Sequence, residues 1–141
     1  MALQHRADRR ADGRLVLVVD DDLGIRGLVR EVLEDAGFAV VTAADGRAAL
    51  DRAAERWPDL VVLDLGLPRL DGEGVARGLR DTHTAVPPIL IVSAANDIAV
   101  VAARVSAFAY LRKPFDLDEL VATVHRGLDT DTATMSPATD S

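Results

Sequence analysis

Residues 15–22 read LVLVVDDD, a continuous aliphatic run that ends in three aspartates. Five aliphatic residues in a row are typical of a strand that is covered on both faces, as in a parallel sheet. Similar, largely apolar runs follow along the chain, at residues 39–43 (AVVTA), 60–63 (LVVL), 89–92 (ILIV) and, more weakly, 109–111. The sequence therefore predicts five short strands.

The segments between these runs have helical periodicity. In the first segment the apolar residues that form one helical stripe are Ile25, Leu28, Val29, Val32 and Leu33. Asp45 is suited to cap a second helix. A weaker helix is expected at 72–80, where two internal glycines lower the helix propensity, and a short one at 98–105. Asp116, with Glu119 three positions later, resembles a capping box that opens the last helix.

Strands and helices that alternate five times predict an α/β fold. We expect a five-stranded parallel sheet of strand order 2-1-3-4-5 with helices on both faces, which is a flavodoxin-like (βα)5 fold. The chain of 141 residues suits one domain, which we place at residues 15–128. Residues 1–14 and 129–141 have little apolar content, so we expect flexible terminal segments there.

The overall composition excludes several classes of function. Hydrophobic residues make up 49% of the chain, the formal net charge is −7 and there are no cysteines. A negative chain repels phosphate backbones, so we expect no direct nucleic-acid binding. No apolar run reaches the roughly 18 residues that a membrane helix requires, and the first residues do not form a signal peptide. These features predict a cytoplasmic protein without membrane insertion.

Polar side chains follow four of the predicted strands. Asp20 and Asp21 come after the first strand, Asp64 after the third, Ser93 after the fourth and Lys113 after the fifth. In the expected sheet order the first and third strands are neighbours, so these carboxylates should face one crevice. Because several close carboxylates repel one another, a hard divalent cation would stabilise them, and Mg²⁺ suits sparse carboxylate ligation.

Each of these residues also has a simpler explanation. Three consecutive aspartates can form a solvated turn, and we expect Asp22 to face solvent. Lys113 is the only lysine among 16 basic residues, but a lone lysine is usually a surface residue. Ser93 could donate a hydrogen bond to a phosphoryl oxygen or simply cap a helix. It is no hydrolase nucleophile by motif, because no Gly-x-Ser-x-Gly surrounds it, and the chain has no glycine-rich nucleotide-binding motif.

Four stretches together resemble the receiver domains of bacterial response regulators, including chemotaxis receivers. They are VLVVDDDLGIR (16–26), PDLVVLDLGLPRLDG (58–72), ILIVSA (89–94) and YLRKPFDLDEL (110–120). Each stretch alone is moderate evidence, but all four occur in order, and each lies at its own predicted strand. The resemblance covers residues 15–128, the whole predicted domain.

The resemblance implies a phosphorelay switch. Asp64 matches the phosphoacceptor, which receives a phosphoryl group from a histidine kinase, a phosphotransfer protein or a small phosphodonor. Ser93 and Lys113 match the pair that contacts the phosphoryl oxygens, and Tyr110 matches an aromatic switch residue. The implied Mg²⁺ ligands are Asp20 (through water), Asp21, Asp64 and the backbone carbonyl of Gly66. The protein would then be no enzyme in the ordinary sense, but a phosphoacceptor that assists its own phosphorylation and slow dephosphorylation.

The resemblance also implies how the signal leaves the domain. Movement of Ser93 toward the phosphoryl group would let Tyr110 turn inward and repack the surface of the fourth helix, fifth strand and last helix. The partner on that surface would be an effector protein or an output domain of a longer regulator, and phosphorylation could also drive formation of a homodimer. The alternative is a small Mg²⁺-dependent aspartyl-phosphate phosphatase or phosphotransferase, but Asp64-Leu65-Gly66 lacks the second aspartate usual in those enzymes.

Three departures from the family pattern concern the expected output surface. Only 20 positions separate Ser93 from Lys113, about two fewer than usual, so we expect a short fourth helix. Ser106 stands where glycine is common. Phe108 stands where a small or acidic residue is common, and it either forms an exposed contact or packs in the core.

Overall fold

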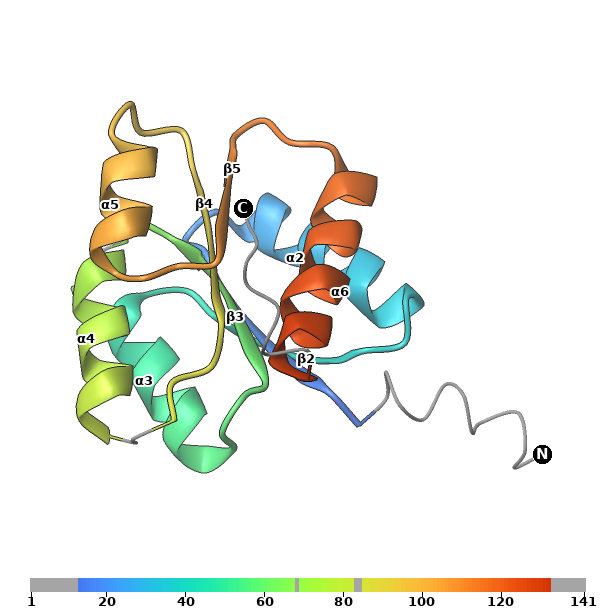
Figure 1. Ribbon diagram of the computed structural model, residues 1–141, viewed down its shortest axis with the longest axis horizontal. Helices are drawn as coiled ribbons and strands as arrows, with labels where there is room; N and C mark the ends of the chain where they lie inside the picture. Colours follow the sequence, from blue (N-terminus) through green and yellow to red (C-terminus); the bar gives the residue numbers. More distant parts are fainter. Residues whose placement is uncertain (1–12, 68, 83–84, 133–141) are drawn as a thin grey trace.

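A computed structural model describes residues 13–67, 69–82 and 85–132 of the chain. Its centre is a five-stranded parallel sheet in the order β2-β1-β3-β4-β5 (Figure 1). The strands are β1 Leu15–Val19, β2 Ala39–Ala43, β3 Leu60–Asp64, β4 Ile89–Ser93 and β5 Ala109–Arg112. This topology confirms the predicted fold class and strand order.

Five helices cover the two faces of the sheet (Figure 1). They are α2 Leu23–Asp35, α3 Gly46–Glu55, α4 Gly72–Thr82, α5 Ile98–Arg104 and α6 Leu117–Thr132. Helices α2 and α6 pack on one face, against Val16 and Val18 of β1. Helices α3, α4 and α5 pack on the other face, against Leu17 and Val19. Because successive strand residues point to opposite faces, β1 supplies both cores and is buried throughout.

The expected helices are all present, with differences that have physical reasons. Helix α4 is regular despite its glycines because they permit close packing, with an added Cβ at Gly78 lying 2.7 Å from Leu50 of α3. Helix α6 continues to Thr132, four residues beyond the domain boundary expected at 128. Leu28 belongs to the apolar stripe of α2, yet 53% of its surface is exposed. The flexible ends expected at 1–14 and 129–141 lie largely outside the described residues.

The segment around α5 has the expected departures. Helix α5 has seven residues, in agreement with the short spacing between Ser93 and Lys113. Ser106, just beyond this helix, adopts a left-handed backbone conformation with φ 59°, which explains why glycine is usual there. Phe108 packs into the core beneath α6 and lies against Gly127, so the structure favours the core alternative.

None of the helices in the described ranges is long and apolar enough to cross a membrane.

Candidate functional site

The site lies at the carboxyl edge of the sheet, where β1 passes into α2. The backbone N–H of Asp20 donates to the Ala43 carbonyl (3.1 Å), so the ladder between β1 and β2 extends one residue beyond the strand. The Asp22 carboxylate then caps α2 by accepting from the Ile25 N–H (3.0 Å). Asp22 is exposed as expected, and in addition it fixes where the helix begins.

Three carboxylates converge at this edge. Asp20, Asp21 and Asp64 each offer one oxygen, and these oxygens lie within 4.8 Å of one another. Asp20 is 2% exposed and Asp64 is 7% exposed, whereas Asp21 faces solvent. Strands β1 and β3 are neighbours in the sheet, so their carboxyl ends bring these residues together. The adjacency predicted from the sequence is therefore present.

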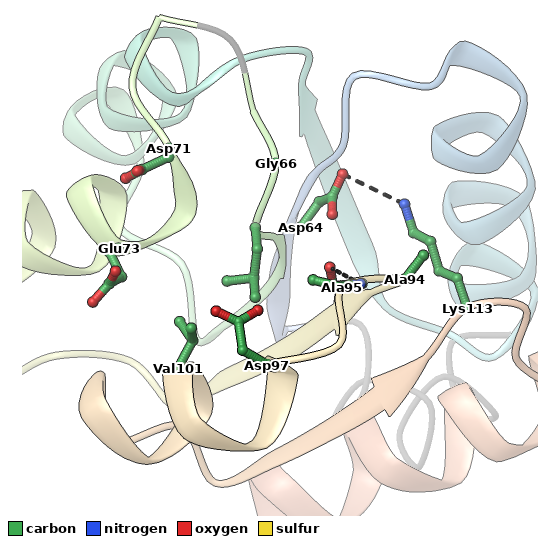
Figure 2. A pocket seen from close by; sticks show the side chains of 11 residues that line it. Asp64, Gly66, Asp71, Glu73, Ala94, Ala95, Asp97, Val101 and Lys113 are labelled. Atoms are coloured by element: carbon green, nitrogen blue, oxygen red, sulfur yellow. Dashed lines mark hydrogen bonds and ion pairs between the residues drawn. The ribbon is translucent and has the colours of Figure 1, made fainter.

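Lys113 joins the cluster from the end of β5. Its Nζ lies 2.8 Å from Oδ2 of Asp20 and 3.4 Å from Oδ2 of Asp64. The backbone N–H of Lys113 donates to the Ser93 carbonyl (3.0 Å), which ties the end of β5 to β4. Figure 2 shows the ammonium group directed at Asp64. The only lysine of the chain is thus an internal counter-ion of the carboxylates.

Burial and the charge of the opposite partner act in opposite directions on the pKa values of Asp64 and Lys113. For Asp64 the largest cause is burial, which raises the pKa; Lys113 lowers it, Asp20 raises it, and the net result is a pKa above the usual value. Burial alone would lower the pKa of Lys113. The hydrogen bond to Asp20 and the charges of Asp64 and Asp20 outweigh burial, so the pKa of Lys113 is raised. The cluster therefore retains a protonated lysine beside a carboxylate that is costly to ionise.

A pocket of about 470 Å³ opens in front of Asp64 (Figure 2). Gly66, Ser93 and Lys113 line it together with Asp64. Three further acidic residues contribute to its lining: Asp71, Glu73 and Asp97. The Gly66 N–H donates to the Asp64 carboxylate. Asp20 and Asp21 are not part of this wall and reach Asp64 from the β1 side. The pocket is large enough to admit a phosphoryl group to Asp64.

Ser93 and Tyr110, the two residues assigned to switching, occupy different environments. Ser93 is buried, and its Oγ accepts a hydrogen bond from the Ala95 N–H (3.1 Å), so it stabilises the turn after β4. Tyr110 lies beside Ile91 in the sheet register, is 42% exposed and does not line the pocket. The structure therefore places Ser93 in the site and Tyr110 outside it.

Two polar contacts near the site were not predicted from the sequence. Arg26 of α2 donates from Nη1 to the backbone carbonyl of Asp20 (2.8 Å). Arg104 at the end of α5 pairs with both carboxylate oxygens of Glu73 on α4 (3.0 and 3.1 Å). In the sequence Arg26 and Arg104 look like solvated helix residues. Their roles depend on distances across the fold that no local pattern carries.

A second, apolar cleft of about 460 Å³ lies on the other side of Lys113. It runs between α2 and the segment that joins β5 to α6, and its walls include Ile25, Leu28, Phe115 and Leu117. The exposed side chain of Leu28 therefore forms a wall of this cleft. The apolar surface borders the polar site, because Lys113 contributes to both.

Comparisons with known proteins agree with this geometry. The family model described as the response regulator receiver domain matches residues 16–125. Response regulator MprA of Mycolicibacterium vanbaalenii is 47% identical over 109 residues, which cover 76% of this chain and 47% of MprA. Transcriptional regulatory protein KdpE of Mycobacterium tuberculosis is 42% identical over 121 residues, which cover 84% of this chain and 53% of KdpE. The chain thus spans about half the length of these curated relatives.

Solved structures give the same result. The receiver domain of NtrX from Brucella abortus superposes with a TM-score of 0.75 at 38% identity, and the match covers 82% of this chain and 98% of that domain. These comparisons give no support to the alternative of an aspartyl-phosphate phosphatase. The family match extends over most of the chain, from β1 to α6, and the sheet order agrees with it. The chain belongs to the receiver domains of two-component response regulators.

Proposed function

We propose that Asp64 is the phosphoacceptor of this receiver domain. The observation that carries the proposal is the position of its carboxylate, which is buried at the end of β3, faces an open pocket and lies 3.4 Å from the Lys113 ammonium. Asp20 and Asp21 lie outside the wall of that pocket, so Asp64 is the member of the cluster best placed to meet a donor from that side.

The cluster suits Mg²⁺. Carboxylate oxygens from Asp20, Asp21 and Asp64 are the hard ligands that this ion prefers, and the exposed side of Asp21 leaves room for water. We assign these three residues and the carbonyl of Gly66 as the residues that would hold the ion. Bound there, Mg²⁺ would offset the negative charge of the carboxylates and of the incoming phosphoryl group.

The proposed reaction is a single transfer of a phosphoryl group to Asp64. An Asp64 oxygen forms a bond to phosphorus while the bond between phosphorus and the donor nitrogen of a phosphohistidine breaks, and the released imidazole takes up a proton. Lys113 is positioned to hold one phosphoryl oxygen, and Ser93 to donate to another after leaving Ala95. The protein acts as a phosphoacceptor that assists its own phosphorylation and slow dephosphorylation, not as an enzyme that turns over a separate substrate.

The partner that donates the phosphoryl group would be a histidine kinase or a phosphotransfer protein. The apolar cleft beside Lys113 supports this assignment because it offers such a protein contact area next to the pocket, at Leu28 and Phe115. A cytoplasmic location belongs to the same proposal.

The output surface is formed by α5, β5 and α6. Phosphorylation adds a charge of about −1.5 to −2, and Ser93 would move toward it. Tyr110 would then turn inward from its exposed position and change the surface that an effector protein or an attached output domain contacts. A phosphorylation-dependent homodimer is the corresponding self-association, and light scattering with and without a phosphoryl mimic would exclude it if both states are monomeric.

The experiment that tests the site is intact-protein mass spectrometry after incubation with acetyl phosphate and Mg²⁺. We expect the wild type to gain one phosphoryl group only when Mg²⁺ is present and Asp64→Asn to gain none. Asp51→Asn, which changes an exposed aspartate on α3, is the matched control and should behave as the wild type. Phosphorylation of Asp64→Asn at the wild-type rate would show that the assignment is wrong.

A further inference from the structure

The loop between β1 and α2 holds neighbouring carboxylates at fixed positions, although their negative charges repel one another. Asp20 is anchored through its side chain by Lys113 and through its N–H by Ala43. Asp22 is anchored as the cap of α2, and its N–H donates to Oδ1 of Asp20 (2.9 Å). Asp21 stands between them. In the described part of the chain no hydrogen bond or ion pair holds its carboxylate, so its position depends on the backbone.

The backbone at this point is held by Arg26. Asp20 lies beyond the end of β1, so its carbonyl has left the regular ladder. Among the residues that the structure describes, its one hydrogen-bond donor is Nη1 of Arg26, at 2.8 Å. A buried carbonyl needs such a partner. Because this carbonyl belongs to the peptide that joins Asp20 to Asp21, the contact sets the plane from which the Asp21 side chain leaves.

The position of Arg26 in α2 makes this contact stable. The capped first turn of the helix fixes its backbone, since the Arg26 N–H donates to the Asp22 carbonyl (2.9 Å). The Arg26 side chain reaches back to the Asp20 carbonyl. Arg26 therefore binds the loop twice, at Asp22 through its backbone and at Asp20 through its side chain. Arg26 forms no ion pair with a carboxylate in the described ranges. Its guanidinium group serves the backbone of the loop.

We propose that Arg26 is a positioning residue of the metal site, which holds the Asp20–Asp21 peptide so that the Asp21 carboxylate meets Asp20 and Asp64. The proposal rests on the proposed function, in which these three carboxylates bind Mg²⁺. Arg26 does not touch the ion or the phosphoryl group, and it acts through the carbonyl of Asp20.

Positioning and charge predict opposite results when Arg26 is replaced. If its positive charge were what mattered to a nearby dication, removing that charge would strengthen Mg²⁺ binding, because like charges repel. If the residue holds the ligand loop, removing it weakens binding. Residues that orient metal ligands typically change affinity by about 10–100-fold. The sign of the change therefore separates the two explanations.

The test is a Mg²⁺ titration of the metal-free ¹⁵N-labelled protein, followed by amide chemical shifts. We expect Arg26→Gln to weaken Mg²⁺ binding by about tenfold or more. Its Asp21 and Asp22 amides should also be displaced before any metal is added. Arg26→Lys retains the charge but offers a compact donor in place of the guanidinium fork, so it should weaken binding by a smaller factor. Arg30→Gln is the control, since it removes an arginine one turn later that pairs with Glu34.

The outcomes are distinct. Wild-type affinity or tighter binding in Arg26→Gln would overturn the positioning role while leaving the proposed Mg²⁺ site intact. Absence of Mg²⁺ binding in the wild type would overturn both. A matching thermal unfolding midpoint for Arg26→Gln and Arg30→Gln would show that a loss of affinity is not a loss of fold. Should Arg26→Gln fail to fold, Arg26→Lys decides, because weaker binding with the charge retained supports positioning and unchanged binding contradicts it.

Discussion

The central strands of the sheet are much more deeply buried than β5 at its edge. Every residue of β1 and β3 is buried, and their carboxyl ends present the acidic cluster. In β5 no residue is fully buried, and Tyr110 and Arg112 are exposed. Apolar burial is the main stabilising contribution in a fold of this kind. The three carboxylates are therefore held by fully buried strands, and the proposed output surface lies on the least covered strand.

The helices show the same contrast. Helix α6 has 16 residues, and the Asp116 carboxylate at its start accepts from the Asp118 N–H. Helix α5 has seven residues, no side-chain cap at Asp97 and the left-handed Ser106 near its end. Its Arg104 is tied to Glu73 of α4 by a largely exposed ion pair, which typically contributes less than about 1 kcal/mol. Segments of this kind open locally at low cost, which suits the rearrangement proposed for this surface.

The largest expected effect is on the free energy of unfolding when a side chain of β3 is truncated, compared with one of β5. Leu63→Ala in β3 should lower the free energy of unfolding by about 3 kcal/mol, because Leu63 is fully buried. Tyr110→Ala in β5 should lower it by about 1 kcal/mol or less, since much of the ring is already in water. Urea unfolding followed by the fluorescence of Trp57, the only tryptophan, measures both. Leu63→Ile, which keeps the volume, is the control, and equal losses at the two positions would contradict the comparison.

An intermediate effect concerns how β5 is fastened to the rest of the domain. A Cβ added at Gly127 of α6 would collide with the ring of Phe108, which precedes β5. Gly127→Ala should therefore cost about 2 kcal/mol by overpacking, although alanine is the better helix former. The double variant Gly127→Ala/Phe108→Leu should recover part of the loss in the same unfolding experiment. A stabilised Gly127→Ala would show that Phe108 yields easily and that this edge is looser than the structure indicates.

The smallest expected effect is a gain at the turn between α5 and β5. Ser106→Gly should stabilise the domain by about 0.5–1 kcal/mol, because the left-handed conformation costs more for a residue with a Cβ than for glycine. Ser106→Ala keeps the Cβ and should bring no such gain. Thermal unfolding compares the two variants. If glycine proved no better than alanine, backbone strain at Ser106 would not be a source of the weakness of this edge.

The sequence predicted the features that depend on regular patterns. Uninterrupted aliphatic runs mark doubly covered strands, and their alternation with helices predicts a parallel sheet, for which 2-1-3-4-5 is a usual strand order. Asp20, Asp64 and Lys113 could therefore be placed at one edge in advance. Periodicity could not show that Leu28 lines a cleft, because a helix stripe looks the same whether a neighbouring element covers it fully or stands apart. Here Phe115 and Leu117 leave the cleft open.

Polar contacts between residues of different elements could not be predicted from such local patterns. Arg26 holds a carbonyl six positions earlier, and its local sequence resembles any solvated helix face. Glu73 and Arg104 are 31 positions apart, and their pairing depends on where the short α5 is placed. Motif resemblance identified residues with shared chemistry. The residues that hold the surrounding backbone and helices, such as Arg26 and Arg104, could be identified only from the packing of this chain.

The contact of Lys113 with Asp20 and Asp64 has a practical consequence for anyone who handles this protein. Lys113 is the sole side-chain amine of the chain, since the other 15 basic residues of 16 are arginines. Reagents that acylate amines for biotinylation, dye labelling or surface immobilisation therefore have a single side-chain target, and it lies in the pocket. Because its ammonium group is paired with Asp20 and Asp64, Lys113 should react slowly, and acylation located at Lys113 by peptide mapping reports how readily it leaves these carboxylates. Ligands that cover it should slow the labelling.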